Sequence, residues 1–134
     1  MAELVRLKSF PDPMRGTLVA MEMPHQIPFA VPRVFLLSGV PENAIRGDHA
    51  HRLQHQFVVA VHGAFEAVAE DASGSRTFLL EDAAMGLHVP PMTWLTLRAT
   101  KPDSTIMVLA SEHFSEGDYI RERAEFDRLL VKDR

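Results

Sequence analysis

The chain has 134 residues, of which 46% are hydrophobic and 24% charged, a balance typical of one folded domain. It contains no cysteine, which excludes disulfides, thiolate nucleophiles and cysteine-ligated zinc or iron–sulfur sites. The formal net charge of −4 argues against nucleic-acid binding, and no apolar run approaches the ~20 residues of a membrane span. We therefore expect a single cytoplasmic domain of residues 1–134, whose chemistry at neutral pH depends on its seven histidines and its carboxylates.

Short apolar segments separated by turn residues follow one another along the chain, and several are rich in Val, Phe and Thr. Their spacing of about ten residues predicts an all-β sandwich or barrel. The expected strands are Gly16–Glu22, Val31–Ser38, Gln56–His62, Ala64–Glu70, Arg76–Leu80, Leu87–Val89, Trp94–Arg98 and Thr105–Ala110. Pro24, Pro28 and Pro32 predict an extended connector between the first two of these strands. His62 and Gly63 predict a tight hairpin between the next two.

The last segment, Asp118–Lys132, has a different pattern. It contains no glycine or proline, and its apolar residues recur at helical spacing. Ser115, three residues before Asp118, resembles a weakened capping box. The sequence therefore predicts one C-terminal α-helix packed on the β-barrel.

The segment from Arg46 to His51, with the sequence RGDHAH, carries the strongest chemical signal. Residues two apart on a strand point to the same face, so His49 and His51 would present both imidazoles together. Arg46 would join them only if the strand passes through Gly47 without a bulge. Two imidazoles and a guanidinium facing inward would supply an acid, a base and an anion clamp.

The spacing from His49 and His51 to Gln56 and then Gly63 resembles the first motif of the cupins, in which a glutamate normally stands where this chain has Gln56. The second cupin motif should end in a further histidine, and Trp94 and Leu95 stand near its place. Two imidazoles and a neutral amide are a poor ligand set for a divalent cation. We therefore expect no catalytic metal.

A closer resemblance covers nearly the whole chain. The sequence resembles the nucleotide-sugar 3,4-ketoisomerases of the RmlC-like cupins, a WxcM-like family that acts on dTDP-4-keto-6-deoxyglucose. The matching stretches are RGTLVA from Arg15, IPF from Ile27, Arg33-Val34, RGDHAH from Arg46, Gln56, Gly86-Leu87, the Pro91-to-Trp94 turn, VLAS from Val108 and DYIR from Asp118. The resemblance implies an RmlC-like cupin jelly-roll barrel, in agreement with the pattern of short strands and the C-terminal helix.

The resemblance also implies the chemistry. The product would be a dTDP-3-keto-6-deoxyhexose, formed by proton transfer through an enediol, without a cofactor or metal. One of His49 and His51, with His49 slightly favoured, would move the carbon-bound proton while the other assists at the oxygens. Arg46 and Arg33 would bind the enediolate or the pyrophosphate. The partners implied are the dTDP-sugar and a second copy of the chain, in a homodimer with exchanged N-terminal strands.

Two further residues are candidates for contacts with the substrate. Gln56, expected to point inward from its strand, would hydrogen-bond a substrate hydroxyl or a neighbouring protein group. Trp94, beside a Pro-Pro turn, would stack on a sugar or thymine ring or pack at the end of the barrel. Among the other histidines, His88 is a weaker candidate, and His55 should lie outside the barrel because its parity is opposite to that of His51.

Phe35 and Leu36 stand where the family usually carries tyrosines, one of which is thought to lie in the active site. Tyr119 is the only tyrosine, and its place in the predicted helix indicates a structural role. Two alternative functions follow from this departure. One is a nucleotide-sugar 3,5-epimerase-like enzyme, and the other is a cupin that binds a nucleotide sugar without catalysis.

Overall fold

The computed structural model describes residues 1–133, so the expected domain of residues 1–134 extends one residue beyond the described part. Nearly all regular structure is β. The strands are β1 (Glu3–Arg6), β2 (Lys8–Asp12), β3 (Gly16–Ala20), β4 (Arg33–Val40), β5 (Ile45–His51), β6 (Gln56–His62), β7 (Phe65–Asp71), β8 (Gly74–Leu80), β9 (Met85–Val89), β10 (Trp94–Ala99), β11 (Ser104–Ala110) and β12 (Tyr119–Ile120). The helical elements are the 3₁₀ turn η1 (Glu116–Asp118) and the helix α1 (Arg123–Asp133). None of the helices in this part of the chain is both long and apolar enough to cross a membrane.

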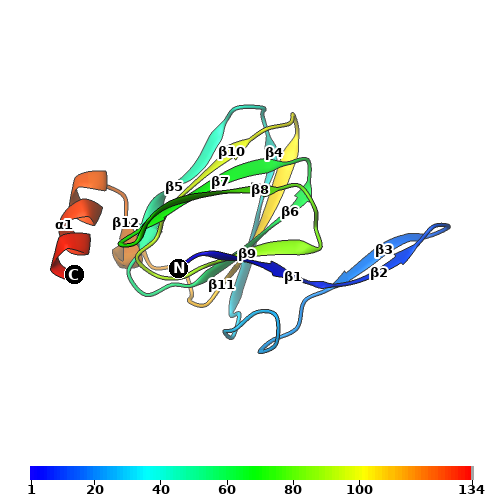
Figure 1. Cartoon of the computed structure of the whole chain (residues 1–134), viewed down its shortest axis with the longest axis horizontal. Coiled ribbons are helices and arrows are strands. Elements are labelled where there is room, and N and C mark those ends of the chain that lie inside the picture. Colours follow the sequence, from blue (N-terminus) through cyan, green and yellow to red (C-terminus); the bar gives the residue numbers. More distant parts are fainter. Residues whose placement is uncertain (134) are drawn as a thin grey trace.

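Two antiparallel sheets face each other and enclose the main core (Figure 1). Their strand orders are β1-β9-β6-β11-β4 and β12-β5-β10-β7-β8. Alternation along the strands sends every second side chain inward, so Val58, Leu87 and Leu97 meet between the sheets. The eight predicted strands are all present, with ends displaced by a few residues. The expected fold class, an all-β jelly-roll barrel with a C-terminal helix, is confirmed.

The predicted hairpin at His62 and Gly63 is wrong. Strand β6 pairs with β9 and β11, whereas β7 pairs with β8 and β10, so Gly63 joins one sheet to the other. Gly63 has φ +70°, and an added Cβ would lie 2.1 Å from the Ser104 hydroxyl oxygen. The glycine is therefore required by a close crossing between the sheets, not by a two-residue turn.

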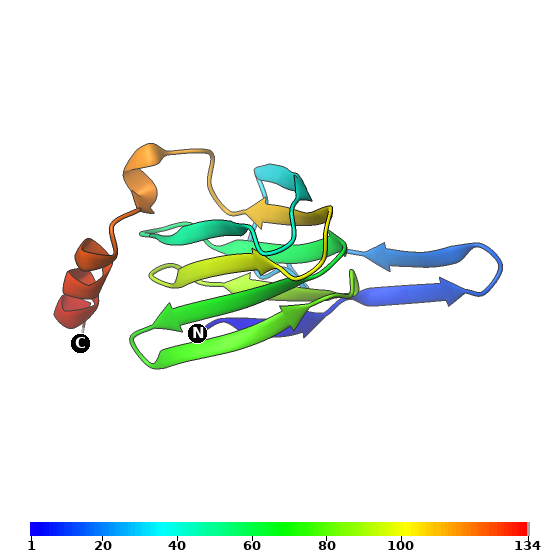
Figure 2. The same ribbon diagram turned by 90° about the horizontal axis from the view of Figure 1, so that it is seen from above.

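Strands β2 and β3 form a separate hairpin that projects away from the barrel, on the side opposite α1 (Figures 1 and 2). Three of its apolar side chains are largely exposed: Phe10, Met14 and Leu18. The connector that follows returns to the barrel and packs Ile27 and Phe29 against the outer face of the first sheet. The hairpin thus exposes apolar surface that the rest of its own chain does not cover.

The predicted helix over Asp118–Lys132 begins too early. Asp118 ends the 3₁₀ turn, Tyr119 and Ile120 form β12, and α1 starts only at Arg123. Pairing with β5 gives the β12 backbone ladder hydrogen bonds, and Ile120 becomes fully buried in a cluster with Trp94 and Phe126. Burial of that side chain and the tertiary pairing therefore override a local helical pattern.

A bulge in β5 determines which side chains enter the barrel. His49 pairs with Leu95, but Thr96 pairs with Gly47, so Asp48 is an extra residue in the ladder. Gly47 has φ +74° and Asp48 has φ +62°, and a Cβ on Gly47 would lie 2.9 Å from the Leu95 carbonyl oxygen. A glycine is therefore required at position 47, both because φ is positive and because a Cβ would be too close to the Leu95 carbonyl oxygen.

The sequence analysis expected Arg46 to share the face of His49 and His51 only on a strand without a bulge, and this expectation is wrong. Arg46 and His49 are three residues apart, a separation that would place them on opposite faces of a regular strand. The extra residue, Asp48, restores them to the same face, and both side chains line one cavity.

Candidate functional site

A cavity of about 410 Å³ lies between the two sheets, at their β4, β5 and β12 edges. This volume is within the range of small-molecule sites. Its apolar walls come from strands of both sheets and include Phe35, Leu37, Val58, Leu95 and Leu97. Its polar lining consists of six side chains: Arg33, Arg46, His49, Gln56, Tyr119 and Arg121. The cavity therefore combines three guanidinium groups and one imidazole with apolar walls from both sheets.

His49 presents a neutral imidazole to this cavity. Its Nδ1 lies 3.0 Å from the Gly47 carbonyl oxygen, which can only accept, so Nδ1 carries the proton. The other ring nitrogen, Nε2, then has a free lone pair. Burial lowers the pKa of His49 below its ordinary value of 6.5, against the opposing effect of the Gly47 hydrogen bond. His49 therefore has the form of a general base near neutral pH.

His51 lies deeper than His49, with a relative exposure of 5%, and is not among the residues that line the cavity. The two imidazole rings meet edge to face, with centroids 5.0 Å apart. Nδ1 of His51 is 3.1 Å from a carboxylate oxygen of Asp118. Burial and, to a smaller extent, the neighbouring His49 lower the pKa of His51 to about 4, against the opposing effect of Asp118. His51 is therefore neutral at physiological pH.

Tyr119 occupies a place that the sequence did not indicate. It lies on β12 opposite His51, and its ring centroid is 4.3 Å from that of His51 and 4.9 Å from that of His49. The predicted helical position is wrong, and the phenol ring forms part of the cavity wall. Spacing could not have found it, because only the pairing of β12 with β5 brings this residue to the histidines.

Arg33 lies at the same cavity with an unusual environment. Its guanidinium carbon is 4.5 Å from the Phe35 ring centroid and 5.4 Å from that of Phe114. Its Nη1 is buried and has no hydrogen-bond partner among the described residues. Because a buried, unpaired guanidinium nitrogen is costly, this group is suited to receive an anionic ligand.

Arg121 is a further cavity residue that sequence reasoning did not single out. Its guanidinium lies over the Tyr119 ring, 4.2 Å from the centroid, and donates two hydrogen bonds to the carboxylate of Glu116, at 2.7 and 2.9 Å. The resemblance included this position only as part of the DYIR motif. Three arginines therefore concentrate positive charge around one cavity of an acidic chain.

The structure does not bring Trp94 into the cavity. Trp94 is 5% exposed and packs with Ala50, Ile120 and Phe126 beneath α1, on the outer side of β10. Its indole Nε1–H donates to Asp48 Oδ1 at 3.1 Å, which ties the bulge of β5 to this cluster. The observed contacts are those of a packing residue at the end of the barrel.

His55 and His88 also lie outside the cavity, as parity predicted for His55. His55 Nδ1 is 3.0 Å from His88 Nε2, and the two rings stack with centroids 5.3 Å apart. Phe29 of the connector covers both rings. Within residues 1–133, no three His, Asp or Glu side chains are arranged to hold a metal ion.

The fold and the cavity together define a class of protein, the cupin-type barrels with an H-x-H pair inside. Residues 1–131 match the family described as FdtA: WxcM-like, C-terminal, and the chain belongs to this family. Over 118 residues the chain is 34% identical to the TDP-4-oxo-6-deoxy-alpha-D-glucose-3,4-oxoisomerase of Aneurinibacillus thermoaerophilus, covering 88% of this chain and 85% of that protein.

Solved structures show the same relationship. The sugar 3,4-ketoisomerase QdtA of Thermoanaerobacterium thermosaccharolyticum, in complex with TDP, superposes with a TM-score of 0.92 at 27% identity. That match covers 98% of this chain and 96% of QdtA. The RmlC epimerase of Mycobacterium tuberculosis shares the fold, with a TM-score of 0.77 at 21% identity over 88% of this chain and 66% of that one. The expected RmlC-like architecture is thereby confirmed.

The lowered pKa of His51 predicts a loss of stability as the pH falls. Unfolded His51 titrates near 6.5 and folded His51 at about 4, so in this interval the unfolded state binds more protons. The contribution of His51 to the free energy of unfolding is therefore complete above pH 6.5 and is lost as the pH falls through about 4. Between these values the free energy of unfolding should change by at most about 1.4 kcal/mol per pH unit because of this imidazole. Urea denaturation across this pH range measures the slope, which should be smaller in His51→Asn.

The matched control is His25→Asn, because His25 is exposed on the connector and makes no contact with this network. Its dependence of unfolding free energy on pH should follow the wild-type curve. Equal slopes for the wild type and His51→Asn would contradict the prediction.

Proposed function

We propose that this protein is a sugar 3,4-ketoisomerase that converts dTDP-4-keto-6-deoxyglucose to a dTDP-3-keto-6-deoxyhexose. The observation that carries the proposal is the neutral His49 imidazole, with Nε2 free, in a cavity lined by three arginines. The family match and the 34%-identical oxoisomerase support this reaction over a 3,5-epimerase-like activity or binding without catalysis. Since nucleotide sugars are cytoplasmic metabolites, we place the enzyme in the cytoplasm.

The reaction needs one proton transfer at each of C3, O4, O3 and C4, and no change in the overall oxidation state of the sugar. A base removes the proton on C3, the electron pair of that C–H bond forms the C3=C4 double bond, and O4 takes up a proton to give the enediol. The O3–H bond then breaks, its electrons form the C3 ketone, and C4 receives a proton. A base with a pKa near neutrality and a second proton-transfer group suffice for both halves.

We assign removal of the C3 proton to His49 and assistance at the oxygens to His51. His49 lines the cavity and has an unprotonated Nε2. His51 is buried behind it, and its Nε2 lies 3.3 Å from the Gln56 amide nitrogen. A buried, already hydrogen-bonded nitrogen is a poor base for a carbon acid, so the geometry favours His49 at C3.

Arg33 and Arg46 are the proposed binding groups for the enediolate or the diphosphate. Arg33 is supported by its buried, unpartnered Nη1, and Arg46 by its position next to His49 after the bulge. Guanidinium groups suit either anion because they form paired hydrogen bonds to oxygens in one plane. Gln56 would hydrogen-bond a substrate hydroxyl from the cavity wall. Trp94, buried beneath α1, is assigned no contact with the substrate.

Incubation with dTDP-4-keto-6-deoxyglucose in deuterated water, followed by NMR, tests the reaction. The expected result is a ketone at C3 with deuterium at C4, because the enediol is reprotonated from a group that exchanges with solvent. His49→Asn should lower turnover at least about 100-fold and change dTDP affinity less than about threefold, since the base acts on the carbon and not on the nucleotide.

His25→Asn, on the exposed connector, provides the control and should retain wild-type turnover. The proposal is overturned if prolonged incubation gives neither isomerisation nor deuterium incorporation. It is also overturned, at the level of the residue, if His49→Asn turns over at the wild-type rate.

Arg33→Gln tests the anion clamp. Removing a charged donor from a buried anion site costs about 1.5–3 kcal/mol, so dTDP should bind about 10- to 150-fold more weakly. Isothermal titration calorimetry at fixed salt measures the change. Arg128→Gln, an exposed arginine on α1, removes the same charge outside the cavity and should leave affinity within about twofold. Equal losses in both variants would show only the effect of net charge and would refute the clamp.

We further propose that the enzyme is a homodimer in which the β2–β3 hairpins are exchanged. The projecting hairpin exposes Phe10 and Leu18, at 58% and 60% relative exposure. Strand β4 lies at the edge of its sheet, and its outer side chains Val34 and Leu36 are 57% and 58% exposed. These two apolar surfaces, on separate parts of one chain, are suited to cover each other between two copies.

The double substitution Phe10→Ser with Leu18→Ser should convert the dimer to a monomer, because it removes the apolar surface of the hairpin. Size-exclusion chromatography with light scattering measures the mass in solution. Val131→Ser, at a position 69% exposed on α1, is the matched control and should remain dimeric. A monomeric wild type, or a hairpin variant that stays dimeric, would contradict the exchanged arrangement.

A further inference from the structure

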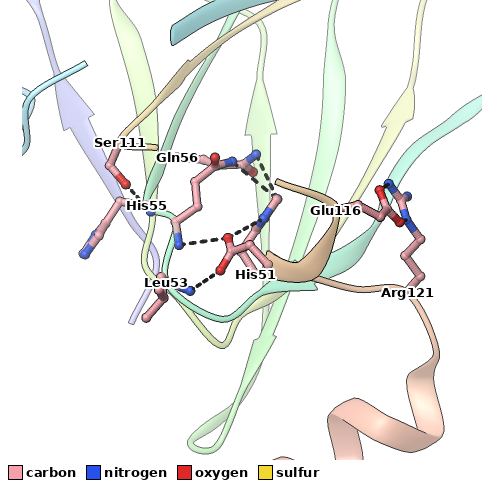
Figure 3. A network of polar contacts seen from close by, with 9 residues as sticks. His51, Leu53, His55, Gln56, Ser111, Glu116 and Arg121 are labelled. Carbon is pink, nitrogen blue, oxygen red and sulfur yellow. Dashed lines mark hydrogen bonds and ion pairs between the residues drawn. The ribbon is translucent and has the colours of Figure 1, made fainter. Parts of the chain in front are cut away.

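Asp118 collects three hydrogen bonds from one short segment of chain. Its carboxylate accepts from the Leu53 amide at 2.7 Å, the Gln54 amide at 3.2 Å and His51 Nδ1 at 3.1 Å (Figure 3). The side chain is only 11% exposed. The two backbone donors fix the position of the carboxylate independently of the imidazole. Asp118 therefore orients the His51 ring, and the ring is not needed to orient Asp118.

The opposite side of the His51 ring faces two carboxamides. The amide nitrogen of Gln56 is 3.3 Å from His51 Nε2, and that of Gln54 is 3.5 Å away. Amide nitrogens donate hydrogen bonds and do not accept them, so Nε2 must be the unprotonated nitrogen. Nδ1 must carry the proton because its partner is a carboxylate. Contacts on both sides of the ring therefore specify the same tautomer.

The surroundings keep this ring neutral. Besides Asp118, the groups near it are the His49 ring, the Tyr119 ring at 4.3 Å and the Arg121 guanidinium. Burial lowers the pKa of His51, and the electrostatic effects of the neighbouring His49 and of the Arg121 guanidinium act in the same direction. The Asp118 carboxylate opposes them without reversing the shift, so its main effect is on orientation and tautomer.

Gln56 connects this buried pair to the cavity, because it lines the cavity whereas His51 does not. We propose that Asp118 is a positioning residue, which fixes His51 as the Nδ1–H tautomer and through it turns the Gln56 carbonyl oxygen toward the substrate. A carboxamide whose nitrogen faces Nε2 has its oxygen left to accept from a sugar hydroxyl. If His51 changed tautomer, Gln56 would present its amino group instead. The role in catalysis rests on the proposed isomerase function, whereas the tautomer does not.

Asp118→Asn tests the proposal with the shape of the side chain kept. The Asn oxygen should remain on the Leu53 amide, the closest donor, so its amino group would face Nδ1 and drive His51 to the Nε2–H tautomer. Two-bond ¹H–¹⁵N correlation spectra of the imidazole report which nitrogen carries the proton. For the isomerase, kcat should fall at least about 100-fold with KM within about threefold, because the arginines proposed to bind the anionic substrate are unchanged.

Gln56→Glu is the second variant. A carboxylate at this position accepts and cannot donate, so it should draw a proton onto His51 Nε2 and move the titration of His51 to higher pH, which an NMR titration measures. Asp127→Asn, on the exposed face of α1 where Asp127 pairs with Arg123, is the matched control. It should change neither the imidazole spectrum nor kcat.

The inference is overturned if wild-type His51 carries its proton on Nε2, or if Asp118→Asn keeps the Nδ1–H tautomer and wild-type kcat. Failure of the proposed function would look different. A wild-type protein with the Nδ1–H tautomer, but without any conversion of dTDP-4-keto-6-deoxyglucose, would preserve the tautomer assignment and refute the isomerase.

Discussion

The return of the chain at residues 118–120 to the edge of β5 is the contact on which the cavity depends. Tyr119 pairs with His51 and Ile120 pairs with Ala50, so one short ladder directs side chains to both faces of the sheet. On the inner face it adds the Tyr119 ring to the two histidines. On the outer face it buries Ile120 beneath α1. Without this pairing the inner face of β5 would lie open at the edge of the sheet.

The bulge at Asp48 is the second constraint, and the two are linked. The bulge places Arg46 and His49 on one face, and the indole of Trp94 donates a hydrogen bond to the Asp48 carboxylate. Trp94 packs in the same cluster as Ile120. The packing beneath α1 therefore supports the backbone geometry of the motif on the other side of the sheet. This explains why a tryptophan near the motif serves the site without entering it.

Electrostatics in the cavity depend on keeping the histidines neutral among arginines. Burial lowers the pKa of both His49 and His51, and the nearby Arg121 guanidinium acts in the same direction. A neutral base and fixed positive charges can coexist in one cavity, whereas protonated imidazoles would compete with the arginines for an anion. An acidic chain thus obtains a local site for a negatively charged substrate without a basic surface.

The sequence by itself determined the features that follow from local alternation. The strand pattern, the H-x-H pair, the inward position of Gln56 and the outward position of His55 could all be predicted, because side chains on a strand alternate with a period of two. The family resemblance added the chemistry that these residues suit. Arg33 could be named only as a candidate, since its buried and unpartnered nitrogen is a property of the folded cavity.

Only the tertiary structure decided the bulge, the crossing between sheets at Gly63 and the change from helix to strand at Tyr119. Each depends on a partner distant in sequence: Leu95 and Thr96 for the bulge, Ser104 for Gly63, and β5 for Tyr119. A local pattern cannot encode such partners. The placement of Asp118 against His51 has the same origin, because the two residues are 67 positions apart and meet only when the barrel closes.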